Sequence, residues 1–156
     1  MRYYQGLYSP KNTKKYLGNT DNVIYRSRWE LLVFRWCDLN PDVIEWVSEE
    51  ITIPYICQTD NKQHTYYVDL YIKYKSGKRV LVEVKPEKQG IEPKPSKGKK
   101  TSTLLTEALV YQKNISKWTA ARKYANINGM HFEVWGETAL KSIGINVTET
   151  RNPKKS

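Results

Sequence analysis

The sequence predicts a single α/β domain with a mixed central sheet, in which a helix is followed by three strands, a second helix and a last strand. Two stretches repeat apolar side chains at helical spacing, and runs rich in β-branched and aromatic residues lie between and after them. At 156 residues the chain is long enough for one hydrophobic core and too short for two well-packed domains. We expect the helices to cover the faces of the sheet.

The N-terminal part combines an arm with the first helix. Residues 1–26 mix tyrosine, lysine and asparagine without a clear period, and we expect a basic, aromatic arm that lies extended over the domain. The first helix is predicted at about 27–39, because Ser27 and Glu30 form an S-x-x-E capping box and Pro41 closes the segment.

The strands of the sheet are predicted in the middle of the chain. Residues 43–53 have strand character with a bulge near their middle, and Pro54 places this stretch at an edge or an end of the sheet. The β-rich runs 66–74 and 79–85 are separated by three residues. They predict a hairpin that forms the centre of the sheet.

The C-terminal part contains a basic loop, a long helix and a short strand. Residues 86–103 hold three prolines, two glycines and a cluster of lysines, which predicts a mobile basic loop. Helical spacing then runs over about 103–126, and 131–135 is predicted as a strand. A last helical turn or two is expected at 137–143, followed by a C-terminal tail at 144–156.

The composition favours a polyanionic partner, with nucleic acid as the first candidate. Lys and Arg number 26 against 16 Asp and Glu, which gives a formal net charge of +10. No apolar run approaches the roughly 20 residues of a spanning helix, so no membrane contact is expected. The two cysteines are interpreted as buried thiols of a reducing compartment, and the two histidines lack the spacing that predicts a Cys/His zinc site.

One of three acid-x-Lys triplets differs from the others in its surroundings. The triplets at Asp60 and Glu92 lie in a polar turn and in the Pro/Lys loop, where charged residues are ordinarily solvated. Glu83 and Lys85 instead interrupt a run of valine and leucine that is typical of a strand covered on both faces. Charged residues are almost never buried there without partners.

Whether Asp69 is such a partner depends on the hairpin loop. A two-residue loop would place Asp69 opposite Val84, with Glu83 on the other face. A three-residue loop, with Gly77 in the left-handed position of a G1 bulge, pairs Asp69 with Glu83 and puts both on the face that carries Lys85. Glycine in the third position favours the second register, although the sequence alone leaves both open.

Two adjacent carboxylates and a lysine suit metal-assisted hydrolysis of a phosphodiester. Carboxylates with Cβ atoms about 5 Å apart repel each other unless a cation lies between them, and Mg²⁺ or Mn²⁺ fits such a pair. A hard ion there would lower the pKa of a water nucleophile and neutralise charge on phosphorus. Lys85 is expected to orient the water or to stabilise the transition state. The competing interpretation is a structural ion cluster on an exposed sheet face.

The candidate residues resemble the motif of the PD-(D/E)xK nuclease superfamily. Four patterns carry the resemblance, namely R-S-x-x-E at 26–30, I-x-I-P-Y at 51–55, Y-x-x-D at 66–69 and V-E-V-K-P at 82–86. They are similar to those of TnsA-type transposon endonucleases, and the layout of residues 1–143 is most similar to the head completion nucleases of T-even-like tailed phages. Val68 replaces the proline of the motif, and no tyrosine follows Gln112 at the spacing of the RecB-like branch.

This resemblance implies a restriction-endonuclease-like nuclease domain at 27–143 with Mg²⁺ or Mn²⁺ as cofactor. It implies Glu30, Asp69 and Glu83 as metal ligands and Lys85 as a further catalytic residue, while helix capping alone is the alternative role of Glu30. The implied activity is cleavage of double-stranded DNA as phage heads are completed, in the host cytoplasm and the virion, beside head or portal proteins. A rival interpretation is a non-enzymatic, DNA-contacting structural protein of the head–tail junction.

Seven further basic residues are candidates for DNA contact. The loop lysines are expected to neutralise phosphates, although a merely solvated loop is equally consistent with the sequence; they are Lys94, Lys97, Lys99 and Lys100. Three more are expected on one helical stripe facing the DNA, namely Lys113, Lys117 and Arg122. Four tryptophans are expected in the core and not stacked on bases; they are Trp29, Trp36, Trp46 and Trp118.

Overall fold

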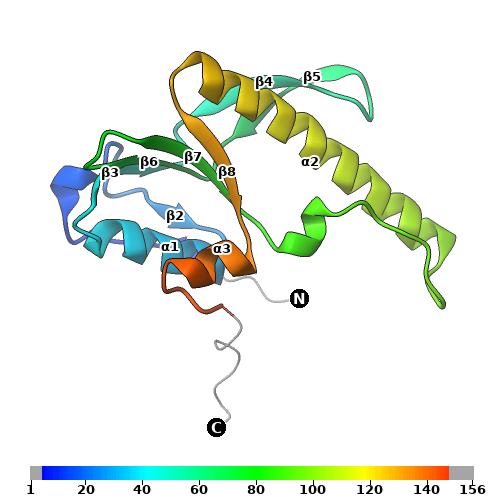
Figure 1. The fold of residues 1–156 in the computed structure, drawn as a ribbon, viewed down its shortest axis with the longest axis horizontal. Helices are drawn as coiled ribbons and strands as arrows, with labels where there is room; N and C mark the ends of the chain where they lie inside the picture. Colours follow the sequence, from blue (N-terminus) through cyan, green and yellow to red (C-terminus); the bar gives the residue numbers. More distant parts are fainter. Residues whose placement is uncertain (1–4, 148–156) are drawn as a thin grey trace, which may run out of the picture.

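A four-stranded mixed sheet forms the centre of the protein. The computed structural model describes residues 5–147. The sheet has the order β3-β6-β7-β8, in which β3, β6 and β7 are antiparallel and β8 is parallel to β7 (Figure 1). The strands span Val43–Ser48, Leu70–Tyr74, Arg79–Val84 and His131–Trp135. With the helices included, the predicted order of helix, three strands, helix and strand is confirmed.

Helices cover both faces of this sheet. Helix α1 (Arg28–Leu39) packs on one face, and the long helix α2 (Thr101–Ile127) packs on the other (Figure 1). Because side chains alternate along a strand, Val80 and Val82 lie in the core that contains α1, whereas Leu81 lies in the core under α2. The short helix α3 (Glu137–Ser142) follows β8. Of the four tryptophans expected in the core, Trp46 and Trp118 are buried, and Trp29 and Trp36 pack at its edge.

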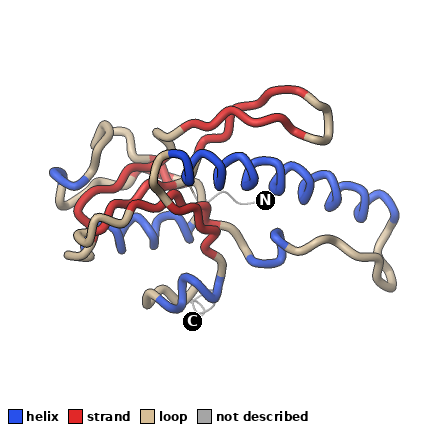
Figure 2. The backbone as a smooth tube through the Cα atoms, turned by 45° about the horizontal axis from the view of Figure 1, so that its top comes forward, coloured by secondary structure: helices blue, strands red, loops and turns tan. Residues whose placement is uncertain are grey.

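A second, two-stranded sheet was not predicted. Strands β4 (Thr52–Cys57) and β5 (Lys62–Tyr67) form an antiparallel hairpin that runs along α2, away from the central sheet (Figure 2). The single strands predicted at 43–53 and at 66–74 were therefore wrong, because each divides between the two sheets. The two points at which the chain passes from one sheet to the other lie beside each other, because Glu49 N–H donates to the Asp69 carbonyl at 3.2 Å. Glu49 has a positive φ of 57° at this point. Val68 N–H donates to the Ile51 carbonyl at 3.0 Å.

The β6–β7 hairpin adopts the three-residue loop. Tyr74 N–H donates to the Lys78 carbonyl at 2.8 Å, and Gly77 has a φ of 96°, which is a conformation that glycine adopts without strain. Leu70 pairs with Val82. The two-residue loop is therefore excluded, and Asp69, which precedes Leu70, lies beside Glu83, which follows Val82.

The N-terminal arm is anchored to the end of α1. Strands β1 (Gly6–Leu7) and β2 (Ile24–Tyr25) pair, and a short 3-10 helix, η1 (Thr13–Lys15), lies between them. The buried Asp38 carboxylate accepts hydrogen bonds from the Tyr8 hydroxyl at 2.5 Å and from the N–H groups of Lys11 and Asn12 at 2.7 and 2.9 Å. The arm is therefore part of the folded unit.

The C-terminal part also joins the core. Ile145 and Val147 are buried in the core that contains α1, so the domain extends past the predicted boundary at residue 143. Residues 148–156 lie outside the described part. The predicted basic loop contains a 3-10 turn, η2 (Glu87–Gly90), before α2 begins. None of the helices between residues 5 and 147 combines the length and apolar character of a bilayer-spanning segment.

Candidate active site

Three carboxylates from separate elements meet at one end of the central sheet. Asp69 directly precedes β6, Glu83 lies near the end of β7, and Glu30 lies in the first turn of α1. The hairpin register places Asp69 and Glu83 side by side on the face that α2 covers. Glu83 is only 2% exposed, and Asp69 and Glu30 are partly buried.

Burial and neighbouring negative charge raise the pKa of two of these carboxylates, Asp69 and Glu30. Burial, followed by the negative charges of Glu83 and Glu30, raises the pKa of Asp69 well above its ordinary value. One hydrogen bond opposes this rise, because Val84 N–H donates to Asp69 Oδ2 at 2.8 Å. Burial also raises the pKa of Glu30. A hard divalent cation would stabilise the charged forms of Asp69 and Glu30, because it binds carboxylate oxygens.

Glu83 is held from two sides. Lys85 Nζ lies 2.9 Å from Glu83 Oε2, and the Tyr66 hydroxyl donates to Glu83 Oε1. Lys85 Nζ also donates to Asn114 Oδ1 of α2 at 3.4 Å. The side chains of Glu83 and Lys85 are thus fixed in relation to each other and to α2.

Glu30 caps its helix and also faces the acidic cluster. Its N–H donates to Ser27 Oγ at 3.1 Å, as the capping box predicts. Its carboxylate reaches back to Arg26 N–H at 2.8 Å, one residue before the position that the standard box uses. Glu30 also interacts electrostatically with the other two carboxylates, because the charge of Glu83 raises the pKa of Glu30 and the charge of Glu30 raises the pKa of Asp69. The two interpretations of Glu30 are therefore compatible.

Two of the three predicted helix cations line a hollow beside the carboxylates. Lys113 and Lys117 line a hollow of about 280 Å³ between α2 and β5, together with Tyr66 and Tyr67. Lys117 Nζ lies 4.8 Å from the centre of the Tyr66 ring. Burial lowers the pKa of Lys117, while the nearby Glu83 and Asp69 charges oppose that change.

Arg122 lies on another flank of α2, so the expected single stripe of three cations was wrong. Its guanidinium packs over the ring of Phe132 in β8, 5.8 Å from the ring centre. The reason is helical geometry, because nine residues at about 100° each place Arg122 roughly opposite Lys113 around the helix axis.

The loop lysines lie away from the carboxylates, near the N-terminal end of α2. This end projects beyond the central sheet (Figure 2). Thr101 and Asn114 are thirteen residue steps apart, which corresponds to about 20 Å along the helix axis. Three of the loop lysines are exposed, namely Lys94, Lys97 and Lys100. Lys99 is instead paired with Glu107 Oε1 at 2.9 Å.

The structure adds two site residues that were not among the predicted ones, Tyr66 and Asn114. Asn114 is 3% exposed, and its Nδ2 has no hydrogen-bond partner among the described residues. A signal for it exists in the sequence, because Asn114 begins a stripe of buried positions that continues at Trp118, Ala121 and Ala125. A polar residue in an apolar stripe indicates a specific polar partner. Tyr66 belongs to the Y-x-x-D pattern but had no assigned role.

Comparison with known proteins agrees with this geometry. Residues 40–137 match the family described as TnsA-like endonuclease N terminal. The chain is 35% identical over 144 residues to the head completion nuclease of Enterobacteria phage T4, covering 90% of this chain and 96% of that protein. No solved structure matches significantly. The chain therefore belongs to the family of TnsA-like endonuclease N-terminal domains.

Proposed function

We propose that this protein is a metal-dependent DNA nuclease that hydrolyses phosphodiester bonds during phage head completion. The observation that carries the proposal is the pair Asp69 and Glu83 on one sheet face, with Lys85 Nζ 2.9 Å from Glu83. The family match and the T4 relative, which is named a head completion nuclease, support both the reaction and the biological setting.

The donor set fits a magnesium or manganese ion. Asp69 and Glu83 would hold it, with Glu30 as a further ligand directly or through water, because all three offer carboxylate oxygens in one acidic cluster. When bound, such an ion lowers the pKa of a water nucleophile and neutralises charge on the phosphate.

The chain's own residues position the reacting groups. Lys85 is placed to donate to the attacking water or to a phosphate oxygen. Asn114 orients Lys85, and its second amide hydrogen-bonding group, Nδ2, is a further donor for water or phosphate. Tyr66 fixes one Glu83 oxygen, which leaves the carboxylate a single orientation.

Double-stranded DNA is the proposed substrate, and its path follows α2. Lys113 and Lys117 would contact the backbone beside the scissile phosphate, and the loop lysines Lys94, Lys97 and Lys100 would contact it farther along. A separation of about 20 Å corresponds to about six base pairs of B-DNA. Arg122 would contact DNA only on the other flank of α2.

The proposed setting is the host cytoplasm during assembly and then the virion, with head or portal proteins as partners. Trimming or cutting packaged DNA before the tail joins is the role that the name of the T4 relative supports.

Cleavage of linear and circular DNA with Mg²⁺ or with EDTA tests the proposal. Asp69→Asn, Glu83→Gln and Lys85→Met should each abolish Mg²⁺-dependent cleavage while leaving the fold intact. Glu92→Gln is the matched control, because Glu92 belongs to an acid-x-Lys triplet in the exposed loop and should cut as the wild type does. Cleavage that persists in EDTA or in Glu83→Gln would overturn the proposal.

A further inference from the structure

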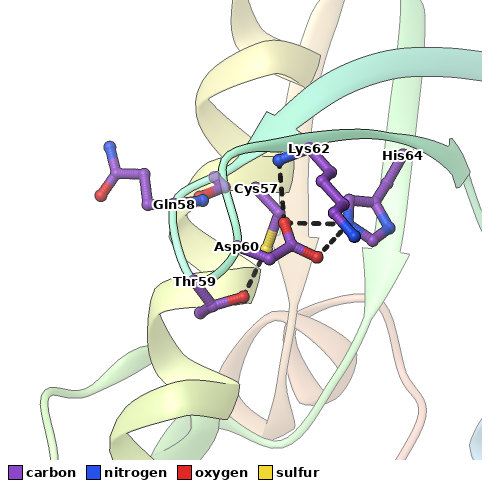
Figure 3. A network of polar contacts seen from close by, with 7 residues as sticks. Cys57, Gln58, Thr59, Asp60, Lys62 and His64 are labelled. Carbon is purple, nitrogen blue, oxygen red and sulfur yellow. Dashed lines mark hydrogen bonds and ion pairs between the residues drawn. The ribbon is translucent and has the colours of Figure 1, made fainter.

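The tip of the β4–β5 hairpin brings together a thiol, a carboxylate and an imidazole. Cys57 ends β4, Asp60 lies in the connecting turn, and His64 lies in β5. Their ligand atoms all lie within 4.8 Å of one another (Figure 3). We propose that these three side chains form a Zn²⁺ site that is separate from the carboxylate cluster of the nuclease.

The strand register explains why these side chains converge. Cys57 pairs with Lys62, and Tyr55 pairs with His64. Paired residues share a face, and alternate residues of one strand do too, so Cys57 and His64 are diagonal neighbours on the same side of the hairpin. The four-residue turn then carries Asp60 over the space between them (Figure 3).

Backbone contacts hold the turn in this shape independently of an ion. Asn61 N–H donates to the Cys57 carbonyl at 2.7 Å, and Asn61 has a left-handed φ of 55°. Lys62 N–H donates to Asp60 Oδ1 at 3.0 Å. Gln58 N–H donates to Ser116 Oγ of α2 at 3.3 Å, which fixes the turn against the domain. The ligands are thus delivered by a preformed loop.

The donor chemistry favours zinc over the hard cation of the nuclease site. Thiolate, imidazole and carboxylate are the usual zinc donors, and Mg²⁺ binds neither sulfur nor imidazole well. Around a tetrahedral zinc at about 2.0–2.3 Å, ligand atoms lie about 3.5 Å apart, so the cluster must contract by only about 1 Å. His64 Nε2 and Asp60 Oδ2, which lie 2.9 Å apart, would instead separate slightly as both bind the ion. Three protein ligands leave a fourth position for water.

The spacing of these residues, C-x-x-D-x-x-x-H, does not match the patterns of paired cysteines and histidines that predict a zinc site from sequence, because one ligand is an aspartate. A bound ion would tie β4 to β5 at their free end. His64 and Tyr55 also line the hollow that contains Lys113 and Lys117, so the ion would rigidify one wall of that hollow.

Cobalt substitution tests the site without reference to cleavage. Purified full-length protein, stripped of metal and reduced, is titrated with Co²⁺ and then with Zn²⁺ in the absence of DNA. We expect one equivalent of Co²⁺ to give the near-ultraviolet absorption of a cobalt–thiolate bond, one equivalent of Zn²⁺ to displace it, and Zn²⁺ to raise the Tm. Asp69→Asn should give the same titration, because its carboxylate belongs to the other cluster.

Variants identify the ligands. His64→Gln and Cys57→Ala should lose the absorption, and Asp60→Asn should weaken binding at least tenfold. His131→Gln, which changes an exposed histidine of β8, is the matched control and should bind as the wild type does. Because Cys57 is buried and its variant could unfold, His64→Gln decides the question. A folded His64→Gln with an unchanged thiolate band, or a wild type with no band, would overturn the zinc site and leave the nuclease proposal untouched.

Discussion

Replacing Asp69 by asparagine should make the metal-free protein more stable while it abolishes cleavage. Asparagine has the same shape, and its side-chain oxygen can still accept the Val84 N–H that Asp69 Oδ2 accepts at 2.8 Å. The substitution removes one negative charge from a cluster in which burial and the charges of Glu83 and Glu30 already raise the pKa of Asp69.

The size of the effect follows from the strand register. Directly opposite side chains have Cβ atoms about 5 Å apart, and two like charges at that distance repel by about 3 kcal/mol at an effective dielectric constant of about 20. The ion pair between Lys85 and Glu83 offsets part of this repulsion. We therefore expect a gain of about 1–2 kcal/mol, which corresponds to a Tm rise of about 2–8 °C for a domain of this size.

The pH dependence has a defined sign. A carboxyl whose pKa is raised on folding contributes stability that is complete below its unfolded pKa of about 3.9 and is lost as the pH rises through the folded pKa. In EDTA the contribution of Asp69 to wild-type stability should decline from about pH 4 towards neutrality, and Asp69→Asn should lack that decline. The difference in Tm between the two proteins should therefore grow with pH.

Thermal melts in EDTA and in Mg²⁺, run beside a plasmid cleavage assay, measure these effects. Mg²⁺ should raise the Tm of the wild type and not that of Asp69→Asn. Asp42→Asn, at a surface carboxylate that is 68% exposed, is the matched control and should shift the Tm by under about 2 °C. An Asp69→Asn variant that melts below the wild type in EDTA at neutral pH, or that still cleaves, would contradict the role assigned to Asp69.

Three further predictions concern other parts of the chain. Glu30→Gln keeps an acceptor for Arg26 N–H, so its free energy of unfolding should stay within about 1 kcal/mol of the wild-type value. It should nevertheless lose most cleavage, with partial rescue by Mn²⁺. A lower Tm with normal cleavage per folded molecule would show that Glu30 only caps the helix. Replacing Lys97 and Lys100 by alanine should flatten the log–log salt dependence of duplex binding by about 0.9 per lost contact, and an unchanged slope would show a merely solvated loop. Asp38→Asn should destabilise the fold by about 1–3 kcal/mol in chemical denaturation at pH 7, because it weakens charge-assisted hydrogen bonds. Burial opposes the change, but hydrogen bonding lowers the pKa of Asp38, so the stability that its carboxylate contributes should be lost below about pH 4. An Asp38→Asn variant as stable as the wild type at pH 7 would contradict this role of Asp38.

The centre of the site could be predicted because local rules determine it. Gly77 in the third loop position favoured the β6–β7 register that the structure has, and that register determines which side chains share a face with Glu83. The capping box at Ser27 likewise located the start of α1, and with it Glu30.

The β4–β5 hairpin could not be predicted because its boundaries depend on tertiary contacts. Residues 66–74 read as one continuous strand, and nothing local shows that the chain changes sheets at Val68 and Asp69. That change depends on two hydrogen bonds between distant parts of the chain. The Ile51 carbonyl accepts from Val68 N–H, and Glu49 N–H donates to the Asp69 carbonyl. The position of Arg122, in contrast, follows from counting residues around α2, and the Asn114 signal was available in the buried stripe of that helix.

Anomalous scattering from crystals soaked in Mn²⁺ would show whether the carboxylates of Asp69 and Glu83 hold a metal ion. We expect a manganese peak between the carboxylates of Asp69 and Glu83, with Glu30 bound directly or through one water, and the loss of that peak in Asp69→Asn. Absence of a peak between these carboxylates, at a Mn²⁺ concentration that supports DNA cleavage in solution, would contradict the assignment of this cluster as the active site.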